Sequence, residues 1–172
     1  MRSRARIGGH SIHPMLVVFP LGLLGTAVIF DILYLITDRT GYQIASAYTI
    51  AAGVIGGVIA ALFGLADLSA VPAGSRAKRV GAVHGGLNLV AVALFAVSWL
   101  LRVGAGNWKP STAALICSFA GIVLAAVAGW LGGELVERYG LGVRENANVD
   151  APGMVSRRPS RGEGRGGYAP SR

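Results

Sequence analysis

The sequence is poor in cysteine and in charged residues, and both shortages limit what the protein can do. Cys117 is the only cysteine among 172 residues, so disulfides within the chain, thiolate metal clusters and a C-x-x-C-H haem attachment are excluded. Charged residues make up 14% of the chain and hydrophobic residues 53%, which is too apolar for an ordinary water-soluble domain. P-loop, G-x-S-x-G and H-E-x-x-H motifs are absent, so catalysis in the usual sense is not expected.

The apolar residues are gathered in four segments, each of which is more than 20 residues long. A helix rises about 1.5 Å per residue, so each segment is long enough to cross the ~30 Å hydrocarbon layer of a bilayer. The short connections between the segments require neighbouring helices to run antiparallel. The sequence therefore predicts an all-α fold, an antiparallel bundle of four transmembrane helices at residues 14–36, 44–65, 80–101 and 112–135.

Basic residues are distributed unevenly among the segments outside the predicted helices. Of the 16 Lys and Arg residues, thirteen precede the first helix, separate the second from the third, or follow the fourth. Only Arg39, Arg102 and Lys109 fall on the opposite side. Because Lys and Arg in short loops resist translocation, the majority side is predicted to be cytoplasmic, with both termini on it. Topology thus accounts for the net charge of +8, and no nucleic-acid partner is expected.

Composition divides the chain into three parts. Residues 1–12 form a basic N-terminal segment, residues 13–141 hold the four helices, and residues 142–172 are rich in Arg, Gly, Pro and Ser. The last part has too few apolar residues to build a core. A disordered, basic cytoplasmic tail is therefore predicted there.

The four helices carry a weak internal repeat. The first and third begin near a histidine, His13 and His84, whereas the second and fourth end on an acidic residue, Asp67 and Glu134. In both cases an aromatic residue precedes the acidic residue by four positions. This arrangement is typical of two helix pairs inserted in the same sense and related by an axis along the membrane normal.

Small residues recur at every fourth position, most clearly at Gly121, Ala125, Gly129 and Gly133. Small side chains let helix backbones approach closely in lipid, and they can also clear room for a flat cofactor. Packing is the more common role of such a row. The row is therefore predicted to lie at a helix–helix interface.

The predicted topology brings His13, Asp67, His84 and Glu134 together at the cytoplasmic end of the bundle. Asn88 follows His84 by four residues, so it lies one turn deeper on the same face of the helix. Ionisable groups are costly inside a membrane and usually face the interior of the bundle. We therefore predict a functional site at this end.

The most specific hypothesis for this site is a b-type haem. Neutral imidazole is a common ligand of haem iron, so His13 and His84 would be its two axial ligands. Asp67 and Glu134 would orient the rings by accepting their second N–H, and Asn88 would support them from the same region. No metal other than the haem iron is predicted.

The alternative interpretation is structural. In this case His13 caps the first helix at the level of the lipid headgroups, and His84 hydrogen-bonds between helices. The acidic residues pair with neighbouring basic residues, namely Arg76, Lys78, Arg79 or Arg138. Asn88 would make a buried hydrogen bond between helices. Asp31, near the outer end of the first helix, is expected to pair with Arg102 or to meet water on the outer side, unless it belongs to another site. The protein would then be a non-catalytic membrane module or scaffold that binds no cofactor.

Several motifs occur in order along the chain, namely GHSIHPMLVVFPLGL, GLADL, the H-G-x-L-N of His84 to Asn88, and GWLGGELVERYG. In these motifs, over about residues 10–141, the chain resembles the bacterial membrane proteins called domain of unknown function 2231. The resemblance implies a four-helix domain in the bacterial inner membrane. That family is similar to the two-haem b-type cytochromes, and some members are fused to a Rieske iron–sulfur domain.

The chain departs from a two-haem pattern because it has only three histidines, which allow at most one bis-histidine haem. The resemblance therefore implies one haem b and electron transfer. It also implies a quinone or an iron–sulfur protein as redox partner, with the lipid bilayer as the surroundings.

Overall fold

The computed structural model describes residues 6, 7, 10–143 and 147. The strands β1 (Arg6–Ile7) and β2 (His10–Ser11) form a short antiparallel hairpin before the first helix, which the sequence did not predict. Nearly all of the predicted tail, residues 142–172, lies outside the described residues, and so does most of the N-terminal segment 1–12.

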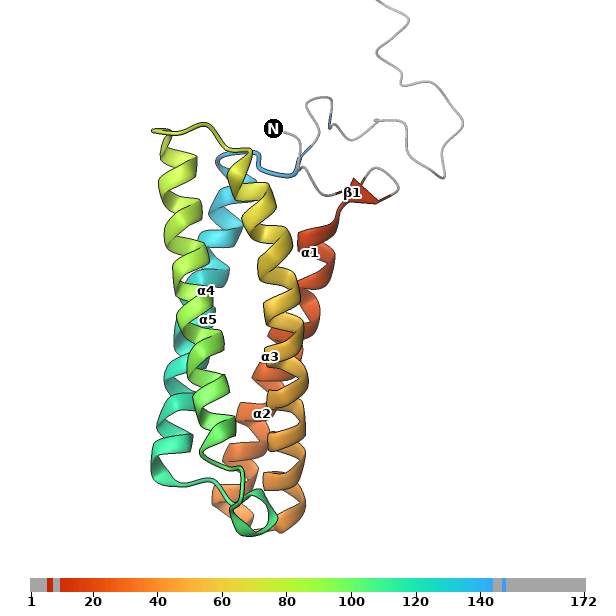
Figure 1. Cartoon of the computed structure of the whole chain (residues 1–172), viewed down its shortest axis with the longest axis vertical. Coiled ribbons are helices and arrows are strands. Elements are labelled where there is room, and N and C mark those ends of the chain that lie inside the picture. The colour runs from red at the N-terminus through yellow and green to blue at the C-terminus, as the bar shows by residue number, and fades with distance from the viewer. Residues whose placement is uncertain (1–5, 8–9, 144–146, 148–172) are drawn as a thin grey trace, which may run out of the picture.

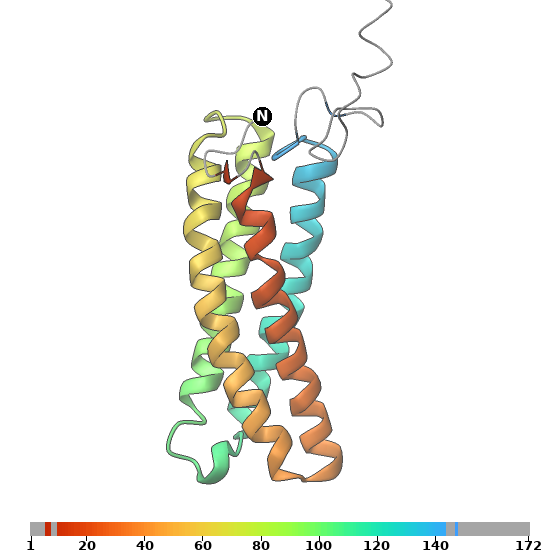
Figure 2. The same cartoon turned by 90° about the vertical axis from the view of Figure 1, so that its right-hand side faces the viewer.

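Helices account for almost all of the described chain. The first span consists of α1 (Ile12–Leu16) and α2 (Val18–Thr37). It is followed by α3 (Thr40–Ser69), α4 (Arg76–Leu100), the 3-10 turn η1 (Gly106–Trp108) and α5 (Thr112–Glu137). Successive spans run in opposite directions, so the start of α1 and the end of α5 lie at the same end of the bundle (Figures 1 and 2).

The described residues include four spans that are long and apolar enough to cross a membrane, which confirms the predicted four-helix fold. Large apolar side chains lie on the outside of the bundle, among them Ile36, Leu89 and Trp130, which are 74%, 68% and 79% exposed. A protein in water would bury many of these side chains, whereas lipid solvates them as well as a core does. The exposed apolar surface therefore agrees with a membrane environment.

Two helices extend further than the apolar segments that predict them. The second span, α3, covers Thr40–Ser69, and the third span, α4, already begins at Arg76. The hydroxyl of Ser75 caps α4 by accepting a hydrogen bond from the backbone N–H of Lys78 at 3.1 Å. The ammonium group of Lys78 in turn donates to the carbonyl of Leu68 at 2.5 Å, near the end of α3, where the same carbonyl also accepts from the backbone N–H of Val71 at 3.1 Å. Polar caps thus let the helices continue beyond their apolar parts.

A proline explains why the first span is divided between α1 and α2. Pro20 has no N–H to donate to the carbonyl of Leu16, so the ladder of helical hydrogen bonds is broken there. The ladder resumes with the bond from the Leu21 N–H to the Val17 carbonyl at 3.2 Å. Val17 keeps helical dihedral angles, with φ of −62° and ψ of −22°, so the chain continues in nearly the same direction.

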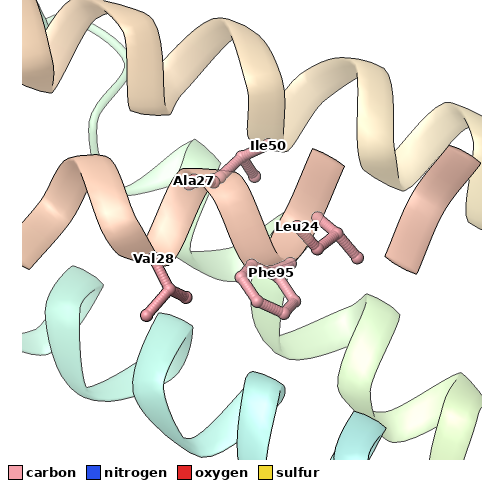
Figure 3. Close-up of a cluster of buried hydrophobic side chains, with 5 residues drawn as sticks. All are labelled: Leu24, Ala27, Val28, Ile50 and Phe95. Atoms are coloured by element: carbon pink, nitrogen blue, oxygen red, sulfur yellow. The ribbon is translucent and has the colours of Figure 1, made fainter. Parts of the chain in front are cut away.

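The apolar core lies where α2, α3 and α4 meet. It consists of Leu24, Ala27, Val28, Ile50 and Phe95 (Figure 3). All five are less than 9% exposed, and Phe95 and Ile50 are fully buried. The core therefore ties the first two spans to the third.

Glycine allows close contacts at only part of the predicted small-residue row. A Cβ atom at Gly121 would lie 2.9 Å from the ring of Phe95, so the row does reach an interface there. At Gly129 and Gly133 a Cβ atom would meet nothing within 4 Å, and both glycines are exposed. The prediction is therefore correct for Gly121 and wrong for these two, because the row winds around α5 away from its neighbours.

Candidate functional site

Both predicted ligand histidines bond through the same ring atom to a helix carbonyl. On α1, Nδ1 of His13 lies 2.9 Å from the carbonyl oxygen of Ala60 on α3. On α4, Nδ1 of His84 lies 2.8 Å from the carbonyl oxygen of Ala128 on α5. A carbonyl only accepts, so Nδ1 carries the proton in each ring, and in a neutral ring the lone pair is left on Nε2. The two half-buried imidazoles are thus held in the same tautomer.

Each imidazole also lies against a glycine, one helical turn beyond the carbonyl that it binds. A Cβ atom at Gly64 would lie 2.9 Å from Cε1 of His13, and one at Gly132 would lie 3.1 Å from Cε1 of His84. Any larger residue would push the ring. The sequence signal for this arrangement is the pattern Ala-x-x-x-Gly, which occurs at Ala60 to Gly64 and again at Ala128 to Gly132. The pattern alone does not predict a contact with the histidines, because only the rotation of α3 and α5 turns these residues toward the rings.

Asn88 contacts His84, as the spacing of four residues predicted. Its Nδ2 donates to the carbonyl of His84 at 2.9 Å and lies 3.3 Å from the ring Nε2 of the same residue. Both contacts are within α4, so Asn88 does not form the hydrogen bond between helices that the structural alternative expected.

The two acidic residues lie at the same end of the bundle as the histidines, but the ring N–H groups described above go to carbonyls instead of carboxylates. Glu134 pairs with Arg138 at 2.8 Å, one turn along α5, and the Arg138 side chain is 71% exposed. This is the pairing that the structural alternative predicted for Glu134. Asp67 is half-buried near the end of α3. The role predicted for the acidic residues, to orient the rings, is filled in this structure by the carbonyls of Ala60 and Ala128.

The metal-ligating side chains at this end of the bundle are spread over several helices. Within the described ranges, no group of three or more His, Cys, Asp and Glu side chains is placed to hold a metal ion. A porphyrin supplies four nitrogens to its iron, so two imidazoles complete the coordination.

A second polar cluster lies toward the opposite end of the bundle. The guanidinium of Arg102 makes a bidentate ion pair with Asp31, with distances of 2.8 Å from Nη1 to Oδ1 and 2.7 Å from Nη2 to Oδ2. Both side chains are fully buried. This confirms the predicted pairing of Asp31 with Arg102, and it removes Arg102 from the basic residues that face the outer water.

Three serines complete this cluster, which we call the buried ion-pair network. Ser46 donates to Asp31 at 2.6 Å, and Arg102 donates to the hydroxyls of Ser46, Ser98 and Ser118 at 3.2 to 3.3 Å. The network joins α2, α3 and α5 to the chain at the end of α4. The sequence does not single out these serines, because single Ser residues are common in membrane helices and only the helix rotation shows which ones face inward.

Comparison with known proteins supports the membrane assignment. No curated protein and no solved structure matches the chain. A family model described as "Predicted membrane protein (DUF2231)" matches residues 9–145, which include all four spans and both histidines of the site. The chain therefore belongs to this family of predicted membrane proteins.

Proposed function

We propose that the protein is an electron-transfer module of the bacterial inner membrane that holds one haem b between His13 and His84. The observation that carries this proposal is the matched anchoring of the two imidazoles. Each donates Nδ1–H to a backbone carbonyl, at 2.9 Å for His13 and 2.8 Å for His84, and so keeps Nε2 for a metal. In metal sites a histidine that ligates through one nitrogen usually donates its other N–H in this way.

The anchoring hydrogen bonds have a chemical consequence as well as a geometric one. A carbonyl that accepts from Nδ1–H raises the basicity of Nε2 and limits rotation of the ring. When bound, the haem supplies a reversible one-electron couple to the site. Asp67 and Glu134 lie at the same end and, in this proposal, act through their negative charge, which favours the ferric state and lowers the reduction potential.

The packing of the helices supports a cofactor between the two histidines. The helix that carries His13, α1, packs against α2 and α3 and makes little contact with α4 or α5. His84 belongs to α4, which packs most extensively against α5. The helix that carries His13 is thus not packed closely against the helix that carries His84, whereas α3 does meet α4 at this end, where Lys78 binds the carbonyl of Leu68. Iron bound at Nε2 of His84 would replace the 3.3 Å contact with the Asn88 amide, which keeps its bond to the His84 carbonyl.

The decisive experiment is an absorption spectrum of protein purified in mild detergent from haem-replete cells. We expect a Soret band that shifts on reduction with dithionite, and we expect His13→Ala and His84→Ala each to abolish it. His10→Ala is the matched control, because His10 is the third histidine of the chain, lies on β2 outside the spans, and should leave the spectrum unchanged.

Absence of a Soret band from folded, unsubstituted protein would refute the haem proposal. A band that survives in both His13→Ala and His84→Ala would refute the assignment of the ligands. The redox partner is a second step of the proposal, in which a quinone or an iron–sulfur protein exchanges electrons with the haem. Oxidation of the dithionite-reduced protein by a soluble quinone analogue, followed in the Soret band, tests that step.

A further inference from the structure

The bundle is built from two helix hairpins that share the same internal contacts. We call α1, α2 and α3 the first hairpin, and α4 and α5 the second hairpin. In each hairpin a histidine on the leading helix donates Nδ1–H to an alanine carbonyl on the returning helix, at Ala60 and Ala128. In each, the glycine four residues later lies against the same imidazole. The two hairpins therefore share one register at this end.

The same register extends to the middle of the bundle. Leu24 follows His13 and Phe95 follows His84 by the same number of residues. Both side chains are buried, and each faces a glycine of its own hairpin. A Cβ atom at Gly53 would lie 2.6 Å from Leu24, and one at Gly121 would lie 2.9 Å from Phe95.

The register continues along the leading helices beyond Leu24 and Phe95. It makes Asp31 of the first hairpin equivalent to Arg102 of the second. Asp31 follows Leu24 by as many residues as Arg102 follows Phe95. These two equivalent positions contact each other directly, with both side chains 0% exposed. Equivalent positions touch only near the axis that relates the two hairpins. The buried ion pair therefore lies at the axis that relates the two hairpins, toward one end of their interface.

We propose that this interface is a pseudo-dimer interface, in which the Asp31–Arg102 pair makes each hairpin select the unlike hairpin as its partner. Two copies of the first hairpin would bring Asp31 against another Asp31. Two copies of the second would bring Arg102 against another Arg102. A buried charge without a partner is strongly destabilising, so both like pairings are rejected. Each hairpin therefore packs against the other hairpin of the same chain.

The serines of the network favour the arginine in the second hairpin and the aspartate in the first. Arg102 receives the hydroxyls of Ser98 and Ser118, whose equivalents in the first hairpin are Ala27 and Ile50. An arginine at position 31 would therefore lack two of the oxygens that surround Arg102. Exchange of the two charges should keep the ion pair but lose part of the solvation of the guanidinium.

The first test reverses the charges in the full-length chain. Asp31→Arg and Arg102→Asp should each lose most of the folded, monodisperse protein recovered in mild detergent, measured by size-exclusion chromatography with light scattering. The double variant D31R/R102D should recover a substantial part of it. Lys109→Asp is the control, because it changes the charge of an exposed outer residue by the same amount as Arg102→Asp and should leave the yield unchanged. A double variant no better than the worse single variant would overturn the proposal.

The second test separates partner selection from simple stability. The neutral double variant D31N/R102Q removes the like-charge penalty from the wrong pairings. Asn has the size of Asp, and Gln is shorter than Arg but stays polar. We expect it to form more dimers and larger species than the unsubstituted chain, measured by light scattering at equal protein concentration. If D31N/R102Q instead shows the same distribution of species as the unsubstituted chain, the pair contributes stability only and selects no partner. Because neither readout involves haem, failure here leaves the proposed cofactor untouched.

Discussion

Alanine substitutions at three glycines test the imidazole anchors directly. A Cβ atom at Gly64 would lie 2.9 Å from Cε1 of His13, and one at Gly132 would lie 3.1 Å from Cε1 of His84. At Gly133, next in the chain, nothing lies within 4 Å. The size of the perturbation should therefore fall in the order Gly64→Ala, Gly132→Ala, Gly133→Ala.

The magnitude follows from the hydrogen bond that each ring must give up or lengthen. A ring carbon cannot remain 2.9 Å from a methyl carbon, so the imidazole of His13 has to turn away from the carbonyl of Ala60, which it now meets at 2.9 Å. Hydrogen bonds between membrane helices contribute about 0.6 kcal/mol on average and up to about 1.7 kcal/mol. Gly64→Ala should therefore lower the free energy of unfolding by about 0.6 to 1.7 kcal/mol.

The assay is reversible unfolding in mixed micelles of a mild detergent and SDS, monitored by tryptophan fluorescence. Gly133→Ala provides the baseline for adding a methyl group to a helix surface. The same variants also address the proposed haem, because loss of a hydrogen bond that orients a ligand usually weakens metal affinity by about 10- to 100-fold. If Gly64→Ala is as stable as Gly133→Ala, the imidazole of His13 is not held against α3 and the anchoring argument is wrong.

Three further predictions concern the core, the surface and the topology. Phe95→Ala should lower the free energy of unfolding by roughly 3 to 5 kcal/mol, because Phe95 is fully buried, whereas Phe19→Ala, at a residue 67% exposed, should change it little in the same micelle assay. Arg138→Ala should change it by less than about 1 kcal/mol, because Arg138 is exposed in its ion pair with the partly exposed Glu134; a larger loss would mean that Arg138 has a second role. A reporter that is active only in the cytoplasm should be active when fused after Arg172, and inactivity there would reverse the predicted orientation.

Much of the fold could be predicted from the sequence because, in lipid, the structure of each apolar segment depends mainly on the segment itself. A segment that is apolar for more than 20 residues has to satisfy its own backbone hydrogen bonds, so it becomes a helix whatever surrounds it. The same reasoning anticipated the pairing of Asp31 with Arg102, since buried charges in a membrane need a partner and few are available. The predicted spans differ from α3 and α4 only at their ends, where capping side chains extend the helices.

The internal repeat is the part of the sequence interpretation that the structure changes. The sequence repeat pairs Asp67 with Glu134. The contacts of the histidines instead pair Gly64 with Gly132, which shifts one returning helix by one residue relative to the sequence repeat. One residue turns a helix by about 100°, so the acidic residues do not occupy equivalent positions in the two hairpins. Only the rotation of each helix in the bundle could reveal this.

The sequence by itself determined the four apolar helices, their alternating direction and the end of the bundle where both His13 and His84 lie, because segment length and the spacing of polar residues are properties of the chain alone. The tertiary structure decided what each imidazole touches. The carbonyls of Ala60 and Ala128 and the glycines one turn beyond them face the rings because of how the helices rotate against each other. That rotation is set by side-chain packing across the whole interface, which no short motif encodes.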